Sequence, residues 1–180
     1  MANKIAMMGF GQLTMFEVTQ NDASGYAAGK GFKLPWVQEM TRETDTNEVK
    51  IYADDSIYLD IKNWNGIKAT ITLAQMPLEM FEKLGFGSMG EGGVLKWNPQ
   101  GVNKQFALSF RCLRADGSYR MMKMFSFTVN EVKESDLRTK GAGDEIVSYK
   151  ISGTFTARVK DGCPGEIKDG TDMEWLDAIS

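Results

Sequence analysis

Residues 106–128 read FALSFRCLRADGSYRMMKMFSFT, and this stretch contains the clearest structural signal in the chain. Apolar and polar residues alternate on both sides of Asp116 and Gly117, a dipeptide that tolerates the positive φ angles of tight hairpin turns. A two-residue turn at this dipeptide would place Phe106 opposite Phe127, and both side chains are apolar. The alternation therefore predicts a β-hairpin with one face in a hydrophobic core.

The same register defines the other pairs of this hairpin. It would place Cys112 opposite Met121, which suits a buried thiol within an apolar alternation. It would also place Lys123 opposite Phe110, which fits an apolar face only if the lysine stem packs and its amine reaches solvent. The two-residue turn therefore explains the apolar positions but leaves Lys123 as a misfit.

Residues 146–159 predict a second, longer strand. Apolar residues occupy every other position, with Gly153 in line, and the positions between them carry serine, threonine, Lys150 and Arg158. This pattern favours a strand of about 14 residues, well above the usual length of about 5–6. One apolar and one polar face are typical of a barrel wall that is wet on one side.

The middle of the chain repeats the alternation. The apolar runs before and after YADDSIY, residues 52–58, keep the same phase, which predicts a turn or break between two strand segments. Farther on, a three-residue loop ending on Gly66 would pair Ile61 with Ala69, because glycine suits the left-handed position of such a loop. The sequence therefore predicts a hairpin turn at residues 64–66.

One helix has clear start and stop signals. Pro77 suits the first turn of a helix, apolar residues follow on one face, and Gly85 provides a C-cap. Residues 173–179 form a weaker helix candidate. The glycine-rich stretch GFGSMGEGG, residues 85–93, predicts a connecting loop, because it lacks the lysine and the Ser or Thr of a phosphate-binding loop.

The composition is that of a folded domain. The chain has 180 residues, of which 42% are hydrophobic and 25% are charged, and its net charge is −3. We expect a single domain over residues 1–180, with residues 1–30 and 160–180 the least distinctive parts. A weakly acidic chain is atypical of dedicated nucleic-acid binders, which carry basic surfaces. No stretch approaches the ~18 apolar residues of a membrane helix, so we expect folding in the cytoplasm and no membrane partner.

The chain contains no histidine, which removes imidazole-based catalysis and histidine-ligated metals. Its two cysteines, Cys112 and Cys163, have no metal-type spacing. Asp54 and Asp55 are adjacent, so in a strand their side chains would point to opposite faces and could not share a proton or a metal. We therefore expect no catalytic site, no metal and no cofactor, and interpret the two aspartates as turn-formers at a subunit contact.

The stretch QEMTRETDTNEVK, residues 38–50, is almost wholly polar and carries charges of both signs. It predicts an exposed loop or hairpin tip, or a contact arm to a neighbouring copy, and these two interpretations are compatible. The candidate subunit contacts lie in this stretch and just after it: Glu39, Arg42, Glu43, Asp45, Glu48, Asp54 and Asp55.

Two other classes of function stay open alongside assembly. A β-sandwich module that binds carbohydrate would use an aromatic platform, but Trp36, Trp64, Trp97 and Trp175 lie in four separate segments. A carboxylate-based hydrolase would need two acids about 5–10 Å apart in a cleft. Long two-faced strands without a catalytic motif favour a protein that assembles, since closure through neighbouring copies removes exposed sheet edges.

The order of four segments resembles a known family. IYADDSIY is followed by ITLAQMPLEMFEKLGF, then by the hairpin of residues 106–128, and then by YKISGTFTARV. An ADD-like element, a short helix of this type and an FAL hairpin with Asp-Gly recur in this order in the phi13-type major tail proteins of long-tailed bacteriophages. The similarity covers residues 34–160, and its specificity comes from the order and spacing of the segments.

The resemblance implies a mainly β protein, a β-sandwich or barrel-like tail tube subunit with one short flanking α-helix. It implies hexameric rings that stack into a tube through which DNA leaves the virion. The implied partners are further copies of the chain and other tail proteins, namely the tape measure, tail terminator and distal tail proteins, with transient passage of DNA. The implied location is the phage tail, after assembly in the host cytoplasm. Residues 38–50 would form an arm that bridges rings, and residues 146–159 would be a barrel strand.

DNA that slides through a tube must not bind to its wall. Basic side chains on that wall would hold phosphates, so we expect the lumen-facing residues to be net neutral or acidic. A ring of Lys150 and Arg158 lining the channel would contradict this expectation.

Overall fold

The computed structural model describes residues 6–53, 56–135 and 147–179. Within these residues the chain forms one antiparallel sheet of nine strands, a separate two-stranded hairpin and one α-helix. The prediction of a mainly β chain with one short helix is confirmed. The strand order is β2 (Gly25–Ala28), β1 (Met7–Asp22), β8 (Gln105–Arg114), β9 (Tyr119–Glu134), β10 (Tyr149–Phe155), β5 (Ser56–Leu73) and β4 (Val37–Ala53), while β11 (Gly165–Gly170) pairs with β9 and β3 (Phe32–Lys33) pairs with β1.

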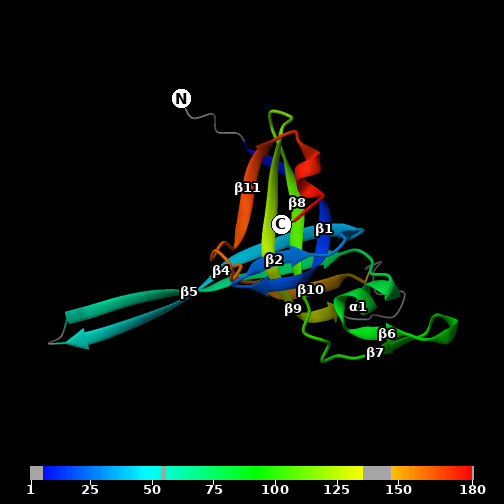
Figure 1. The fold of residues 1–180 in the computed structure, drawn as a ribbon, viewed down its shortest axis with the longest axis horizontal. Helices are drawn as coiled ribbons and strands as arrows, with labels where there is room; N and C mark the ends of the chain where they lie inside the picture. The colour runs from blue at the N-terminus through cyan, green and yellow to red at the C-terminus, as the bar shows by residue number, and fades with distance from the viewer. Residues whose placement is uncertain (1–5, 54–55, 136–146, 180) are drawn as a thin grey trace, which may run out of the picture.

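The sheet curls so that its two halves cross. In Figure 1, β8, β11 and the first part of β9 rise through the upper part of the molecule, whereas the rest of β9 runs with β10, β5 and β4 across its lower part. Hydrophobic residues of both halves meet inside the curl, where Ile71, Phe106 and Phe155 are completely buried. One curled sheet around one main core corresponds to the barrel-like form of the predicted fold.

The hairpin of β8 and β9 forms as predicted, but the predicted register near its turn is wrong. Leu113 pairs with Tyr119, and the N–H of Arg114 donates to the carbonyl of Ser118 at 2.9 Å. The loop therefore has three residues and ends on Gly117, whose φ of 81° is the left-handed conformation that such loops require. Asp-Gly signals a tight turn but does not fix whether two or three residues form it.

A bulge at Ser126 restores the predicted pairing deeper in the hairpin. Ser126 has a φ of 56°, and the register shifts by one residue between Leu108 and Phe106, so that Phe106 faces Phe127 as predicted. Before the bulge, Lys123 pairs with Ser109 and not with Phe110. The misfit of Lys123 therefore came from the assumed turn length.

The predicted hairpin turn at residues 64–66 is wrong. β5 continues through this stretch as one strand of 18 residues, and its pairing with β4 shifts between Trp64 and Gly66. Gly66 has a φ of 133°, which an L side chain rarely adopts. Asn65 and Gly66 therefore form a bulge within a strand, and the strand opposite is β4, which contains residues 38–50.

Replacing Gly66 with alanine is expected to destabilise the fold by about 2–3 kcal/mol, because strain and overpacking add. A Cβ at this position would lie 2.6 Å from the carbonyl oxygen of Phe155 and 2.9 Å from Cγ2 of Thr154. Urea unfolding followed by circular dichroism measures the change. Gly9→Ala is the matched control, since a Cβ there meets nothing within 4 Å and should change stability by less than about 0.5 kcal/mol.

The long strand predicted over residues 146–159 is shorter than expected. β10 has seven residues, from Tyr149 to Phe155, while Ile146 lies outside the described residues. The chain leaves the sheet after Phe155, and the backbone N–H of Thr156 donates to the carbonyl of Ser126 at the bulge. Arg158, predicted on the polar face of this strand, is instead buried.

α1 (Leu78–Leu84) matches its predicted bounds, with Pro77 before it and Gly85 in the left-handed conformation after it. The connecting loop predicted for residues 85–93 is wrong in part. β6 (Gly87–Met89) and β7 (Leu95–Trp97) pair as a small hairpin around the 3-10 turn η1 (Glu91–Gly93). The second predicted helix, residues 173–179, is a 3-10 helix, η2 (Met173–Leu176).

Candidate functional site

Five of the seven predicted contact residues lie on one edge strand. β4 ends the strand order, so within the described residues one of its edges pairs with no other strand. An open edge is a template for pairing with another chain, and charged side chains there limit unwanted pairing. The five residues on β4 are Glu39, Arg42, Glu43, Asp45 and Glu48, while Asp54 and Asp55 lie outside the described residues.

Arg42 lies on the face of β4 opposite to Glu39, Glu43 and Asp45. Its guanidinium carbon lies 5.3 Å from the ring centroid of Phe110, and its Nη1 lies 3.5 Å from the sulfur of Met122. Glu43 instead pairs across the strands with Lys68, on the other side of the sheet. Arg42 is exposed but its guanidinium contacts residues of its own chain, whereas Glu39, Glu43 and Asp45 lie on the other face of β4.

The outer surface of β4, β5, β10 and β9 forms a continuous polar face. Cross-strand rows of this face run from β9 to β4, for example Lys133, Lys150, Thr72 and Glu39. It carries four acidic and three basic side chains, because Asp45 pairs with Lys68 on this face. We call this surface the polar face: Glu39, Thr41, Glu43 and Asp45 on β4; Lys68, Thr70 and Thr72 on β5; Lys150, Ser152 and Thr154 on β10; Thr128, Glu131 and Lys133 on β9.

Beyond the bulge at Gly66, β4 and β5 leave the body of the molecule as a two-stranded ribbon, residues 46–53 and 56–64, that projects far to one side (Figure 1). Val49 pairs with Ile61, and Ile51 pairs with Leu59. These four aliphatic side chains share one face of the ribbon and are 38–47% exposed. We call them the ribbon's apolar face.

The opposite face of the ribbon is charged. The Nζ of Lys50 lies 3.0 Å from Oε1 of Glu48, and the Nζ of Lys62 lies 3.9 Å from the same oxygen. The hydrogen bond from Lys50 lowers the pKa of Glu48, and the same bond raises the pKa of Lys50. The ribbon is therefore amphipathic, with a charged side and an apolar side over which the described part of the chain places no further strand or helix.

An apolar groove lies at the other end of the molecule's long axis, where α1, β6 and β7 are drawn in Figure 1. Its volume is about 690 Å³. Leu78, Val94 and Trp97 are 49–62% exposed in or beside it, which is unusual for side chains of this size. We call this surface the groove, and its apolar lining is formed by Leu78, Phe81, Phe86, Val94, Leu95 and Trp97.

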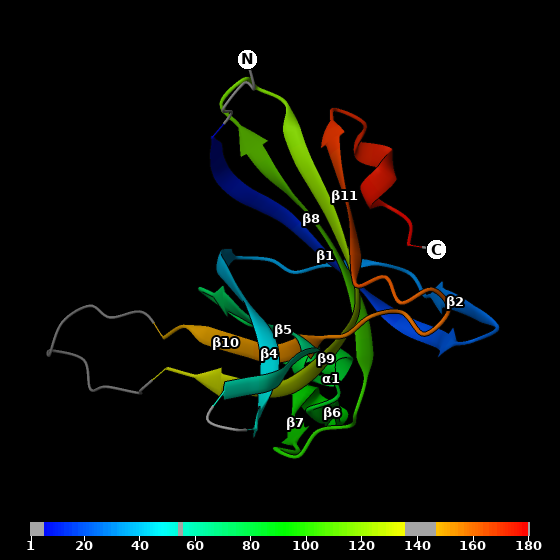
Figure 2. The same cartoon turned by 90° about the vertical axis from the view of Figure 1, so that its left-hand side faces the viewer.

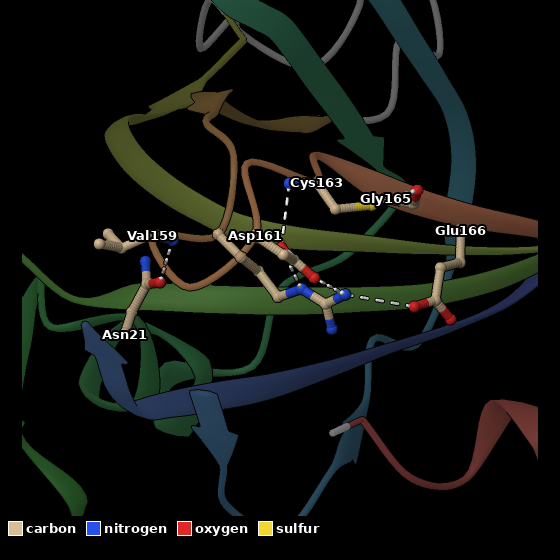
Figure 3. A network of polar contacts seen from close by, with 7 residues as sticks. Asn21, Val159, Asp161, Cys163, Gly165 and Glu166 are labelled. Carbon is tan, nitrogen blue, oxygen red and sulfur yellow. Dashed lines mark hydrogen bonds and ion pairs between the residues drawn. The ribbon is translucent and has the colours of Figure 1, made fainter. Parts of the chain in front are cut away.

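Arg158 organises the turn that follows β10 (Figure 3). Its side chain is 6% exposed, its Nη2 lies 2.7 Å from Oδ2 of Asp161 and 3.4 Å from Oε1 of Glu166, and its guanidinium lies 3.8 Å from the ring centroid of Phe125. The N–H of Cys163 donates to Oδ1 of Asp161 at 3.0 Å. This network holds the connection between β10 and β11 against the sheet, so its role is structural.

The C-terminal segment docks on its own chain, a question that the sequence left open. In Figure 2, η2 lies next to β11. Ser109 donates to the carbonyl of Leu176 at 2.8 Å, and Leu176 is 2% exposed. The Nζ of Lys123 lies 4.2 Å from the ring centroid of Trp175, and burial lowers the pKa of Lys123. The sequence analysis did not predict this docking site, although the polar Ser109 and Lys123 within apolar runs could have indicated it.

Within residues 6–53, 56–135 and 147–179, no group of three or more His, Cys, Asp or Glu side chains is arranged to hold a metal ion. Cys112 is half-buried, and burial raises the pKa of its thiol, which disfavours the reactive thiolate. In the same described ranges, no helix has the length and apolar character needed to cross a membrane.

Comparison with protein-family models and with curated proteins finds no match for this chain. Among solved structures, the chain is similar to one from the cryo-EM structure of the anti-feeding prophage (AFP) baseplate, 6-fold symmetrised. The sequence identity is 7%, the TM-score is 0.48, and the similarity covers 95% of this chain and 98% of that chain.

Proposed function

We propose that this chain is a structural protein of a bacteriophage tail, a tail tube subunit that assembles into hexameric rings. The observation that carries the proposal is an edge strand, β4, whose outer surface belongs to a weakly acidic polar face and which continues into an exposed ribbon. A stable monomer has little use for an open edge and an uncovered apolar ribbon, whereas a subunit of a closed assembly needs both.

Ring formation would close the open sheet edge. A contact between different surfaces of identical copies makes a ring when the rotation between the copies closes, and rings of this kind can stack. Glu39, Glu43 and Asp45, with Lys68 paired to Asp45 at 3.2 Å, lie where a neighbouring copy would approach β4. The order of the four sequence segments, which resembles phi13-type major tail proteins, supports the same assembly.

The polar face would line the channel of such a tube. Its formal charge is −1, with Glu39, Glu43, Asp45 and Glu131 against three lysines, which suits a wall along which DNA must slide without binding. Lys150 belongs to this face. Arg158 is buried and paired with Asp161 and Glu166, so it would not join Lys150 in a basic ring on the channel wall.

In this role the chain would act without an enzymatic activity of its own. Its partners would be further copies of itself and the tape measure, tail terminator and distal tail proteins, and DNA would pass through transiently. The protein would be located in the tail of the virion after assembly in the host cytoplasm. Membership of the phi13-type group stays a prediction, because no family model matches the chain.

Reversing two charges of β4, Glu39→Lys with Glu43→Lys, is expected to reduce ring and tube formation at least tenfold. The formal charge of the polar face would change by four, from −1 to +3, and a repeated like-charge contact would oppose assembly. Negative-stain electron microscopy over a concentration series measures the assembled fraction. Both side chains are exposed, so the unfolding free energy should change by less than about 0.5 kcal/mol.

The matched control is the double reversal Glu174→Lys with Asp177→Lys on the exposed side of the C-terminal segment, away from β4. It changes the net charge of the chain by the same amount. Loss of rings in both variants would assign the effect to total charge, and normal rings in the β4 variant would remove β4 from the subunit contact.

A further inference from the structure

We propose that Asn65 is a self-modification site, at which attack by the backbone nitrogen of Gly66 converts the asparagine into aspartate and isoaspartate. The inference goes beyond the proposed function, because it assigns a covalent reaction to the joint between the body of the molecule and the ribbon. It is carried by the position of Asn65 and Gly66 in the bulge of β5.

The reaction needs only the chain and water. The backbone nitrogen of Gly66 loses its proton to solvent and forms a bond to Cγ of Asn65. The bond from Cγ to Nδ2 breaks, and the leaving nitrogen takes up a proton and departs as ammonia. Water then opens the cyclic imide at one of its two carbonyls, which gives aspartate or isoaspartate. Glycine favours this ring closure, because it has no Cβ to crowd the attacking nitrogen and it tolerates unusual backbone torsions.

The bulge leaves Asn65 outside the regular ladder. The register with β4 shifts between Trp64 and Gly66, so Asn65 has no residue opposite it on that strand. On the other side of β5, the pairing with β10 ends before this position is reached. The side chain of Asn65 is exposed, and within the described residues its amide forms no hydrogen bond. The reacting carbonyl is therefore accessible and is not held by the sheet.

The fold requires the glycine of this pair but not the asparagine. Gly66 has a φ of 133°, and a Cβ there would lie 2.6 Å from the carbonyl oxygen of Phe155. Residue 65 has no such constraint, because its side chain is exposed. The side chain at position 65 therefore sets the reactivity of the joint, and it can be replaced without a loss of packing.

Three aspartates also precede a glycine, but their surroundings differ from those of Asn65. An aspartate closes the same ring most readily when its carboxyl group is protonated. Hydrogen bonds lower the pKa of each of these three carboxyl groups and so keep them ionised. The three are Asp116, Asp161 and Asp169, and the bonds that lower their pKa values most come, in that order, from Ser118, the backbone N–H of Cys163 and Arg120.

The modification would change the joint in two ways. Isoaspartate continues the main chain through its side-chain carbon, so β5 would gain one backbone atom between the body and the ribbon. Both products also add a carboxylate, which makes the net charge of −3 more negative by one. This charge would stand next to Gly66, the ladder partner of Asp45 on the acidic edge strand. A chain that ages before it assembles would therefore carry an altered ribbon joint.

Peptide mapping by mass spectrometry tests the site. The folded chain is kept at mildly alkaline pH and sampled over time. Asn65 is expected to convert at least tenfold faster than Asn63, an exposed asparagine of the same strand that is followed by Trp64. Asn65→Gln should abolish the acidic species seen by ion-exchange chromatography, because glutamine must close a larger ring. Asn63→Gln is the matched control and should leave that species unchanged.

The effect of urea shows whether the folded chain itself reacts. Conversion from the folded state should change less than twofold in urea below the unfolding transition, whereas a reaction through global unfolding rises steeply with urea. Equal conversion of Asn63 and Asn65, or a rate that follows the unfolded fraction, would overturn the proposal. Neither result depends on rings or tubes, so the proposed function is tested separately.

Discussion

Replacing Phe127 with alanine is expected to destabilise the fold by about 3–5 kcal/mol, the range for truncating a buried phenylalanine. Phe127 is completely buried, pairs across the strands with Phe106, and lies 4.6 Å from Phe155 between ring centroids. Its ring also fills the space beside Gly153, where an added Cβ would lie 2.6 Å from it. Truncation would therefore leave a cavity where β8, β9 and β10 meet.

Urea unfolding measures this change as a shift of the midpoint with an unchanged slope. Ile167→Ala is the matched control, because Ile167 lies on β11, is 66% exposed and should change the free energy of unfolding by less than about 0.5 kcal/mol. A loss below about 1 kcal/mol for Phe127→Ala would show that this ring is not central to the core.

Replacing Arg158 with alanine is expected to lower the free energy of unfolding by about 2–4 kcal/mol. The substitution removes the 2.7 Å ion pair with Asp161 and the stacking of the guanidinium on Phe125 at 3.8 Å. Arg158→Met keeps most of the packing and should recover part of the loss. Lys168→Ala breaks the exposed 2.8 Å ion pair with Asp172. It should lower the free energy of unfolding by less than about 1 kcal/mol.

The same network predicts a dependence of stability on pH. The backbone N–H of Cys163 and then the Arg158 guanidinium hold the pKa of Asp161 below its ordinary value of 3.8. A lowered folded-state pKa stabilises the fold above the ordinary value, and this contribution is lost as the pH falls through the lowered pKa. Between neutral pH and acid, Arg158→Met should therefore lose less stability than the unaltered chain, as thermal unfolding at stepped pH would show.

The strongly alternating segments of the fold were predictable, but the details of their pairing were not. Alternation in residues 106–128 fixes the two faces of the hairpin, whereas the third loop residue and the bulge at Ser126 depend on backbone torsions that several residues tolerate. Asn65-Gly66 shows the same ambiguity, since glycine at positive φ suits a bulge as well as a turn. Only the pairing of β4 along the whole of β5 shows that Asn65-Gly66 forms a bulge and not a hairpin turn.

The candidate site was predictable as a segment but not as a surface. The polar composition of residues 38–50 indicates exposure, and β4 does lie at a sheet edge. The sequence does not show that Arg42 turns toward Phe110, or that Val49 and Ile51 remain exposed together with their partners on β5. Both facts depend on tertiary contacts, because apolar alternation normally marks a buried face. The groove was missed for the same reason, since its lining comes from distant segments.

The molar mass of the purified protein in solution tests directly whether the chain assembles into rings. Size-exclusion chromatography with light scattering over rising concentration separates the 20.1 kDa chain from its assemblies. We expect a species of about six chains, together with larger stacks that electron microscopy shows as rings and tubes. A single species of one chain mass at every concentration would contradict it.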